Sequence, residues 1–136
     1  MKLIDVVNGT KALSRLSRQA LPLRISYQIN KAGTRMQEDY GFFCRQEAAL
    51  LDRYKPTLID GSVVTFETPE IAEEYRKEHK ALEEMETDLE IRTIEIGIGM
   101  PIEISAQDLN TLERAGILRI VGDEEDGEDG EAEVNG

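Results

Sequence analysis

The feature that most constrains the fold is an apolar stripe that runs from Leu23 to Tyr54. Its members recur at spacings of three or four residues, which places side chains on one face of an α-helix. They are Ile25, Ile29, Ala32, Met36, Tyr40, Phe43, Glu47, Leu50 and Tyr54. We therefore predict a helix over residues 23–54, about 45 Å long, with Gly33 and Gly41 as points where it could bend or divide.

The residues before the stripe predict a shorter first helix. Asn8-Gly9 is a turn signal, and Thr10 is a residue type that caps helices well. We expect an extended start, a turn at Asn8-Gly9 and a helix that begins at Thr10 and ends before Pro22. The proline ring itself suits the first turn of the following long helix.

After Tyr54 the helical period is interrupted. The Asp60-Gly61 turn signal and the β-branched residues that follow it predict a small β-hairpin, with Thr57–Ile59 paired to Ser62–Phe66. Thr68, followed by a proline, then starts a second helix that we expect to run to about Asp88.

The last third of the chain predicts a strand, a short helix and a final strand. Ile94, Ile96 and Ile98 alternate as on one face of a strand, which is interrupted between Gly99 and Pro101. A short helix then begins with a capping box, Ser105 and Asp108, and Leu109 and Leu112 face inward. Gly116 ends that helix, and "ILRIV" forms the last strand.

These elements predict an α+β fold. Its centre is an antiparallel pair of long helices with a small β-hairpin connection, packed with a short helix and a few short strands. We expect one domain over residues 1–121 and a disordered acidic tail over residues 122–136.

Part of the apolar seam of the long helices should remain available for a second copy, which predicts a homo-oligomer. The seam residues are Ile29, Met36, Tyr40, Phe43, Leu50, Tyr75, Leu82 and Met85.

The net charge of −12 is distributed unevenly. Residues 1–36 have a net charge of +6, residues 37–121 of −10 and residues 122–136 of −8. Such polarity permits either head-to-tail attraction between copies or attraction within one chain. The single cysteine and the lack of a long apolar run predict a protein of the reducing cytoplasm, without a signal peptide or membrane helix.

Few residues offer catalytic chemistry. His79 is the only histidine, and we interpret it as a solvated helical position. Cys44 lies beside two phenylalanines and reads as a buried structural thiol, not as the nucleophile of a Cys44–His79 pair. The acidic tail lacks the order of a calcium-binding loop, and "GIGMP" fits a strand bulge better than a phosphate loop. We predict no catalytic residue, no metal site and no cofactor.

One basic face could attract an anion. Lys11, Arg15 and Arg18 recur on the first helix, and Arg24, Lys31 and Arg35 follow on the next. The sequence shows no aromatic stacking platform beside them, and the overall charge repels polyanions, so we do not expect nucleic acid as a partner.

The arrangement resembles small uncharacterised proteins encoded by bacteriophages and prophages. The resemblance covers most of residues 10–115 and rests on "LPLRISYQINKAG" (Leu21–Gly33), "LEIRTIEI", and Ser-x-x-Asp-Leu-x-x-Leu from Ser105 to Leu112. It implies a phage origin but no established activity, so no functional residue is carried over.

Three functional classes remain. We favour a non-enzymatic phage-type interaction or assembly protein that self-associates through its helical seam. It would act in the host cytoplasm or within a virion, with phage or host proteins as further partners. The first alternative is an acidic anti-defence inhibitor that occupies a nucleic-acid-binding surface of a host protein, through residues 67–90 and 123–133. The second is an enzyme with unrecognised carboxylate chemistry.

Overall fold

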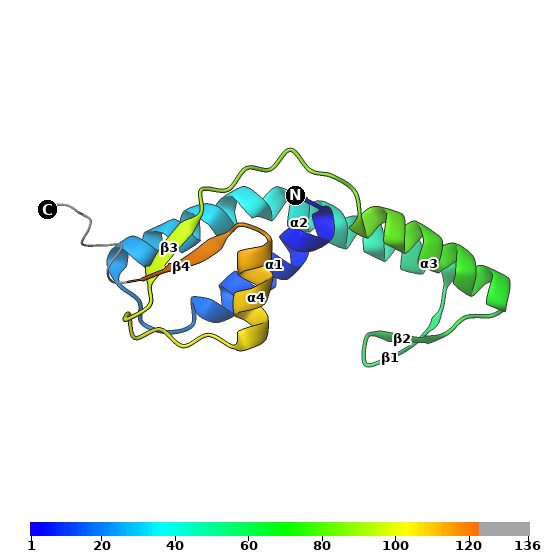
Figure 1. Cartoon of the computed structure of the whole chain (residues 1–136). Coiled ribbons are helices and arrows are strands. Elements are labelled where there is room, and N and C mark those ends of the chain that lie inside the picture. The colour runs from blue at the N-terminus through cyan, green and yellow to red at the C-terminus, as the bar shows by residue number, and fades with distance from the viewer. Residues whose placement is uncertain (123–136) are drawn as a thin grey trace, which may run out of the picture.

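The computed structural model describes residues 1–122 of the chain and shows an α+β fold (Figure 1). Its elements, in chain order, are α1 (Leu3–Leu16), α2 (Leu23–Tyr54), β1 (Thr57–Ile59), β2 (Ser62–Thr65), α3 (Pro69–Glu83), β3 (Ile94–Gly97), α4 (Ala106–Arg114) and β4 (Leu118–Val121). The predicted acidic tail falls almost wholly on residues 123–136, which lie outside the described residues.

The first half of α2 belongs to a packed body that also contains α1, α4 and a two-stranded sheet. In this sheet β3 and β4 run parallel, with Ile94 opposite Leu118 and Ile96 opposite Ile120. Parallel strands need a crossover connection, and α4 provides it. Ile94, Ile96 and Leu118 are buried in the core of this body together with side chains of α1 and α2.

The second half of α2 forms an arm with α3, which runs antiparallel beside it (Figure 1). A second apolar cluster holds this arm to the start of α1; its buried members are Leu3, Val7, Phe43, Leu50 and Leu82. The β1–β2 hairpin connects the two helices at the far end of the arm. The predicted helical pair and its hairpin connection are therefore confirmed. β3 and β4 lie against the first half of α2.

The predicted start of the chain is wrong. α1 is helical from Leu3 onward, and the hydroxyl of Thr10 donates a hydrogen bond to the Val6 carbonyl oxygen inside the helix instead of capping it. Gly9 is buried in the middle of α1, where a Cβ atom would lie 2.5 Å from Cδ1 of Ile117. The glycine that suggested a turn is therefore a point of close helix packing.

α3 ends at Glu83, five residues before the predicted end at Asp88. The chain beyond it is extended and pairs with the N-terminus: the Leu3 amide donates to the Met85 carbonyl oxygen at 2.8 Å, and the Thr87 amide donates to the Met1 carbonyl oxygen at 3.0 Å. These long-range hydrogen bonds replace those that another helical turn would form.

Several local signals are confirmed. α2 spans the predicted residues without a break at Gly33 or Gly41, although Pro22 occupies the position before its first turn. The Thr68 hydroxyl accepts from the Ile71 amide, and Gly116 has a φ of +75° just after α4. Ile98 departs from its predicted face: it is 68% exposed, because β3 ends at Gly97 and a turn follows. None of the helices in residues 1–122 combines the length and the apolar character that crossing a membrane requires.

Candidate functional site

The predicted interaction seam is divided between the two apolar clusters and is mostly packed within one chain. Ile29 and Met36 belong to the core of the body. Tyr40, Phe43, Leu50, Tyr75 and Leu82 belong to the cluster of the arm. Met85 alone is prominently exposed, at 46%. The eight residues therefore do not form one apolar face at the surface.

His79 lies at the interface between α2 and α3, not in the solvated position that we predicted. Its Nε2 atom is 2.8 Å from a Glu47 carboxylate oxygen, and its Nδ1 atom is 3.5 Å from a Glu83 oxygen. The ring stacks on Tyr75 and meets Phe43 edge-on. Burial raises the pKa of Tyr75, and the negative charges of Glu47 and Glu83 raise it further. This polar-aromatic cluster attaches α3 to α2.

Cys44 is exposed, so its interpretation as a buried structural thiol is wrong. It lies on α2 one turn after Tyr40, and the electrostatic interaction with Cys44 is the largest cause that raises the pKa of the Tyr40 hydroxyl. His79 contacts two glutamates instead of the thiol.

The β1–β2 hairpin exposes apolar side chains. Leu58 is 45% exposed, Ile59 60% and Val63 39%. Leu58 faces Val63 across the ladder, while Ile59 faces Ser62. Because neighbouring residues of a strand point to opposite faces, both faces of the hairpin carry an apolar side chain. The turn itself has positive φ at Asp60 and Gly61, as the predicted Asp-Gly hairpin turn requires.

The predicted basic face on α1 is divided. Lys11 and Arg18 are exposed. Arg15 instead pairs with Asp108 on α4, whose carboxylate accepts hydrogen bonds from the Arg15 Nε and Nη2 atoms at 2.8 and 2.7 Å. Arg15 is therefore committed to holding two helices of the body together.

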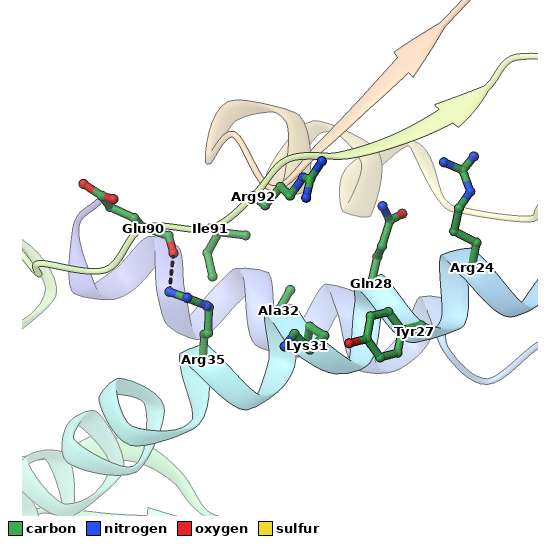
Figure 2. Close-up of a pocket in the computed structure, with 9 residues that line it drawn as sticks. All are labelled: Arg24, Tyr27, Gln28, Lys31, Ala32, Arg35, Glu90, Ile91 and Arg92. Atoms are coloured by element: carbon green, nitrogen blue, oxygen red, sulfur yellow. Dashed lines mark hydrogen bonds between the residues drawn. The ribbon is translucent and has the colours of Figure 1, made fainter.

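Four other basic side chains surround a groove between α2 and the segment that leads into β3 (Figure 2). Arg24, Lys31 and Arg35 come from α2, with Arg24 two turns before Lys31 and Arg35 one turn after it. Arg92 faces them from the other wall. The cavity has a volume of about 630 Å³. We call it the basic groove; its remaining lining residues are Tyr27, Gln28, Ala32, Glu90 and Ile91.

The polar groups of the basic groove are largely unpaired within the described residues. Arg35 donates a hydrogen bond of 3.3 Å to the backbone carbonyl oxygen of Glu90. Within residues 1–122, none of the four basic side chains forms an ion pair with a carboxylate. The side-chain oxygen of Gln28 is also buried, and it has no hydrogen-bond partner among residues 1–122.

Tyr27 supplies an aromatic surface beside the basic side chains, which was not predicted from the sequence. It is 60% exposed, and the Lys31 ammonium lies 5.8 Å from the centre of its ring. The available signal was the spacing of Arg24, Tyr27 and Lys31, because residues three or four apart share one helical face. Arg92 could not be found in this way, because only the fold brings it to α2.

The described residues contain no cluster of three or more histidine, cysteine or carboxylate side chains that could hold a metal ion. In comparisons with protein families, curated proteins and solved structures, no significant match to this chain was found.

Proposed function

We propose that the protein is a non-enzymatic interaction protein of phage type, which acts in the cytoplasm of the host cell and self-associates through its β1–β2 hairpin. The proposal keeps the self-association expected from the sequence but moves the contact from the helical seam to the hairpin. The reason is that the seam side chains already pack within one chain, whereas those of the hairpin are exposed.

The observation that carries the proposal is the exposure of the whole of β1 together with Val63 of β2. An isolated two-stranded hairpin is marginally stable in water, and its open edges can accept another strand. Addition of a second apolar hairpin would provide the third and fourth strands and cover the exposed side chains. Two-fold association of identical surfaces is the commonest form of protein assembly.

The charge pattern favours a second copy as the occupant of this surface. Asp60 is the only charged residue between Thr57 and Phe66, although the chain as a whole has a net charge of −12. Two copies can therefore meet at the hairpin with few like charges in contact.

Ile59→Asp tests the proposal, with Ile98→Asp as its matched control. Both substitutions place a carboxylate on an exposed isoleucine, but Ile98 follows β3 at the opposite end of the molecule (Figure 1). Sedimentation and native mass measurement should show an oligomer for the unmodified chain and for Ile98→Asp. The hairpin variant should be monomeric, with unchanged helical circular dichroism.

Two results would contradict self-association through the hairpin. One is a monomeric unmodified chain at all accessible concentrations. The other is an Ile59→Asp variant that retains the full oligomer mass. In the second case, Met85→Asp would show whether the exposed end of the predicted seam holds the copies together.

A further inference from the structure

The basic groove provides a second feature, independent of the hairpin, that self-association does not explain. The two walls of the groove come from distant parts of the sequence. α2 supplies Arg24 and Lys31, and the segment before β3 supplies Arg92. Like charges gathered in this way repel one another and destabilise the folded chain unless an anion neutralises them. Arrangement of several cations around one cavity therefore points to an anionic ligand.

The groove lining contains four basic side chains and one carboxylate, that of Glu90, although the chain as a whole is acidic. Figure 2 shows the Glu90 carboxylate directed away from the guanidinium groups, and its backbone oxygen is the atom that contacts Arg35. Charges separated by more than about 8 Å are largely screened at physiological ionic strength. A ligand inside the groove thus lies nearest to the four cations and to Glu90, while the carboxylates of Glu38, Asp39 and Asp88 lie around an adjoining cavity at the Arg35 end.

Tyr27 narrows the class of anion. Its ring is exposed at the edge of the groove, with Arg24 and Lys31 one turn away on either side along α2 (Figure 2). Exposed aromatic rings beside cations bind single-stranded nucleic acids, because the ring stacks on a base while the cations contact the adjoining phosphates. Simple phosphate recognition needs the cations but not the ring.

The size of the groove agrees with such a ligand. Its volume of about 630 Å³ lies within the range of pockets that hold small organic ligands, about 300–1,000 Å³. The unpaired oxygen of Gln28 adds an acceptor in the wall, which a small side-chain movement would present to an amino group of a base.

We propose that the basic groove binds a phosphate group joined to an aromatic base, as presented by a nucleotide or by a short stretch of single-stranded nucleic acid. The cations at Arg24, Lys31, Arg35 and Arg92 contact the phosphates, and Tyr27 stacks on the base. The groove does not select a base sequence, since every base has a face on which the ring can stack.

The experiment measures binding of a fluorescein-labelled oligothymidylate of about ten nucleotides to the full chain by fluorescence anisotropy over a salt series. We expect the affinity to fall as salt rises, because bound cations release counterions from the phosphates. Arg92→Ala and Lys31→Ala should each weaken binding and reduce the salt slope by about one. Tyr27→Ala should weaken it about 5-fold to 100-fold, and Tyr27→Phe should retain it, because stacking uses the ring and not the hydroxyl.

Lys11→Ala and Arg18→Ala are the matched controls, since each removes one exposed positive charge outside the groove. Both should leave the affinity within about twofold, because screening limits the effect of distant charges. Competition with ATP distinguishes the sources of the ligand. Displacement of the oligonucleotide by ATP assigns the groove to a single nucleotide, and lack of displacement assigns it to a longer strand.

Three results would overturn the proposal. The first is no binding of either probe by the full chain at low salt. The second is equal loss of binding in the control variants and the groove variants, which would indicate diffuse attraction. The third is displacement by polyglutamate or inorganic pyrophosphate as effective as displacement by the nucleotide probe, together with full binding by Tyr27→Ala. That outcome would assign the groove to acidic proteins or simple anions.

Discussion

Arg15 on α1 and Asp108 on α4 form a bidentate ion pair, with N–O distances of 2.8 and 2.7 Å. The two residues are 93 positions apart in the sequence, so the pair joins the first helix to the crossover unit of β3, α4 and β4. Asp108 is buried, and the adjoining guanidinium lowers the pKa of its carboxyl group below the ordinary value. The pair therefore links the stability of the body to pH.

Asp108→Asn should reduce the melting temperature by about 2 to 5 °C at neutral pH, because it removes the charge that Arg15 contacts. A carboxyl group whose pKa is lowered by folding stabilises the protein above its unfolded-state pKa, near 3.8, and loses this effect as the pH falls through the lower folded-state value. The difference between the variant and the unmodified chain should hence disappear in acid. Calorimetry over a pH series measures it.

Glu113→Gln is the control for this prediction. It also removes a carboxylate from α4, but Glu113 is exposed and forms no ion pair within residues 1–122. If both substitutions lowered the melting temperature at neutral pH equally, the Arg15–Asp108 ion pair would not contribute to stability beyond the loss of a carboxylate from α4.

The sequence predicted those parts of the fold that depend on local signals. The apolar stripe located α2 to the residue, Asp60-Gly61 located the hairpin turn, and Thr68 located the start of α3. Each of these signals acts through backbone geometry or helical periodicity within a few residues. The predicted element boundaries were wrong where contact with a distant segment determines the local structure. Residues 85–87, for example, pair with the N-terminus, and α3 therefore ends early.

The same distinction separates the predicted from the unpredicted site residues. Arg24, Lys31 and Arg35 were identified as basic residues on one helix, but Arg92 reaches them only through tertiary packing. Arg15 was predicted to belong to a free basic face. Its partner, Asp108, was already explained by the capping box with Ser105, so nothing in the sequence indicated that its carboxylate pairs with Arg15. A residue type and its spacing cannot show whether a second role competes for the same side chain.

Gly9 and Gly33 should respond in opposite ways to substitution by alanine. At Gly33 the added methyl group meets no atom within 4 Å, so Gly33→Ala should stabilise the chain by about 0.5 to 1 kcal/mol through helix propensity. At Gly9 the methyl group would lie 2.5 Å from Ile117 and 3.1 Å from Met36, both fully buried. Overpacking of this kind costs about 1 to 3 kcal/mol, which exceeds the helix gain.

Chemical denaturation of the two glycine variants measures the contrast. Gly9→Ala should be less stable than Gly33→Ala by about 1 to 3 kcal/mol. Equal stabilisation of both variants would mean that Ile117 can move aside without cost. The close packing of α1 would then have no role in fixing its position.

His79→Ala should loosen the arm without affecting the body. The substitution removes the contacts of the ring with Glu47 and Glu83 and its packing on Phe43 and Tyr75. Aromatic contacts contribute about 0.5 to 1.5 kcal/mol each, so the opening of α3 should become about 1 to 2 kcal/mol easier. Amide hydrogen exchange should accelerate by about 5-fold to 30-fold in α3 and remain unchanged in α4.

Lys77→Ala, on an exposed position of the same helix, should leave both helices unaffected. If α4 exchanged faster to the same extent as α3, the arm and the body would open as one unit, and the separate stability of the two apolar clusters would be refuted.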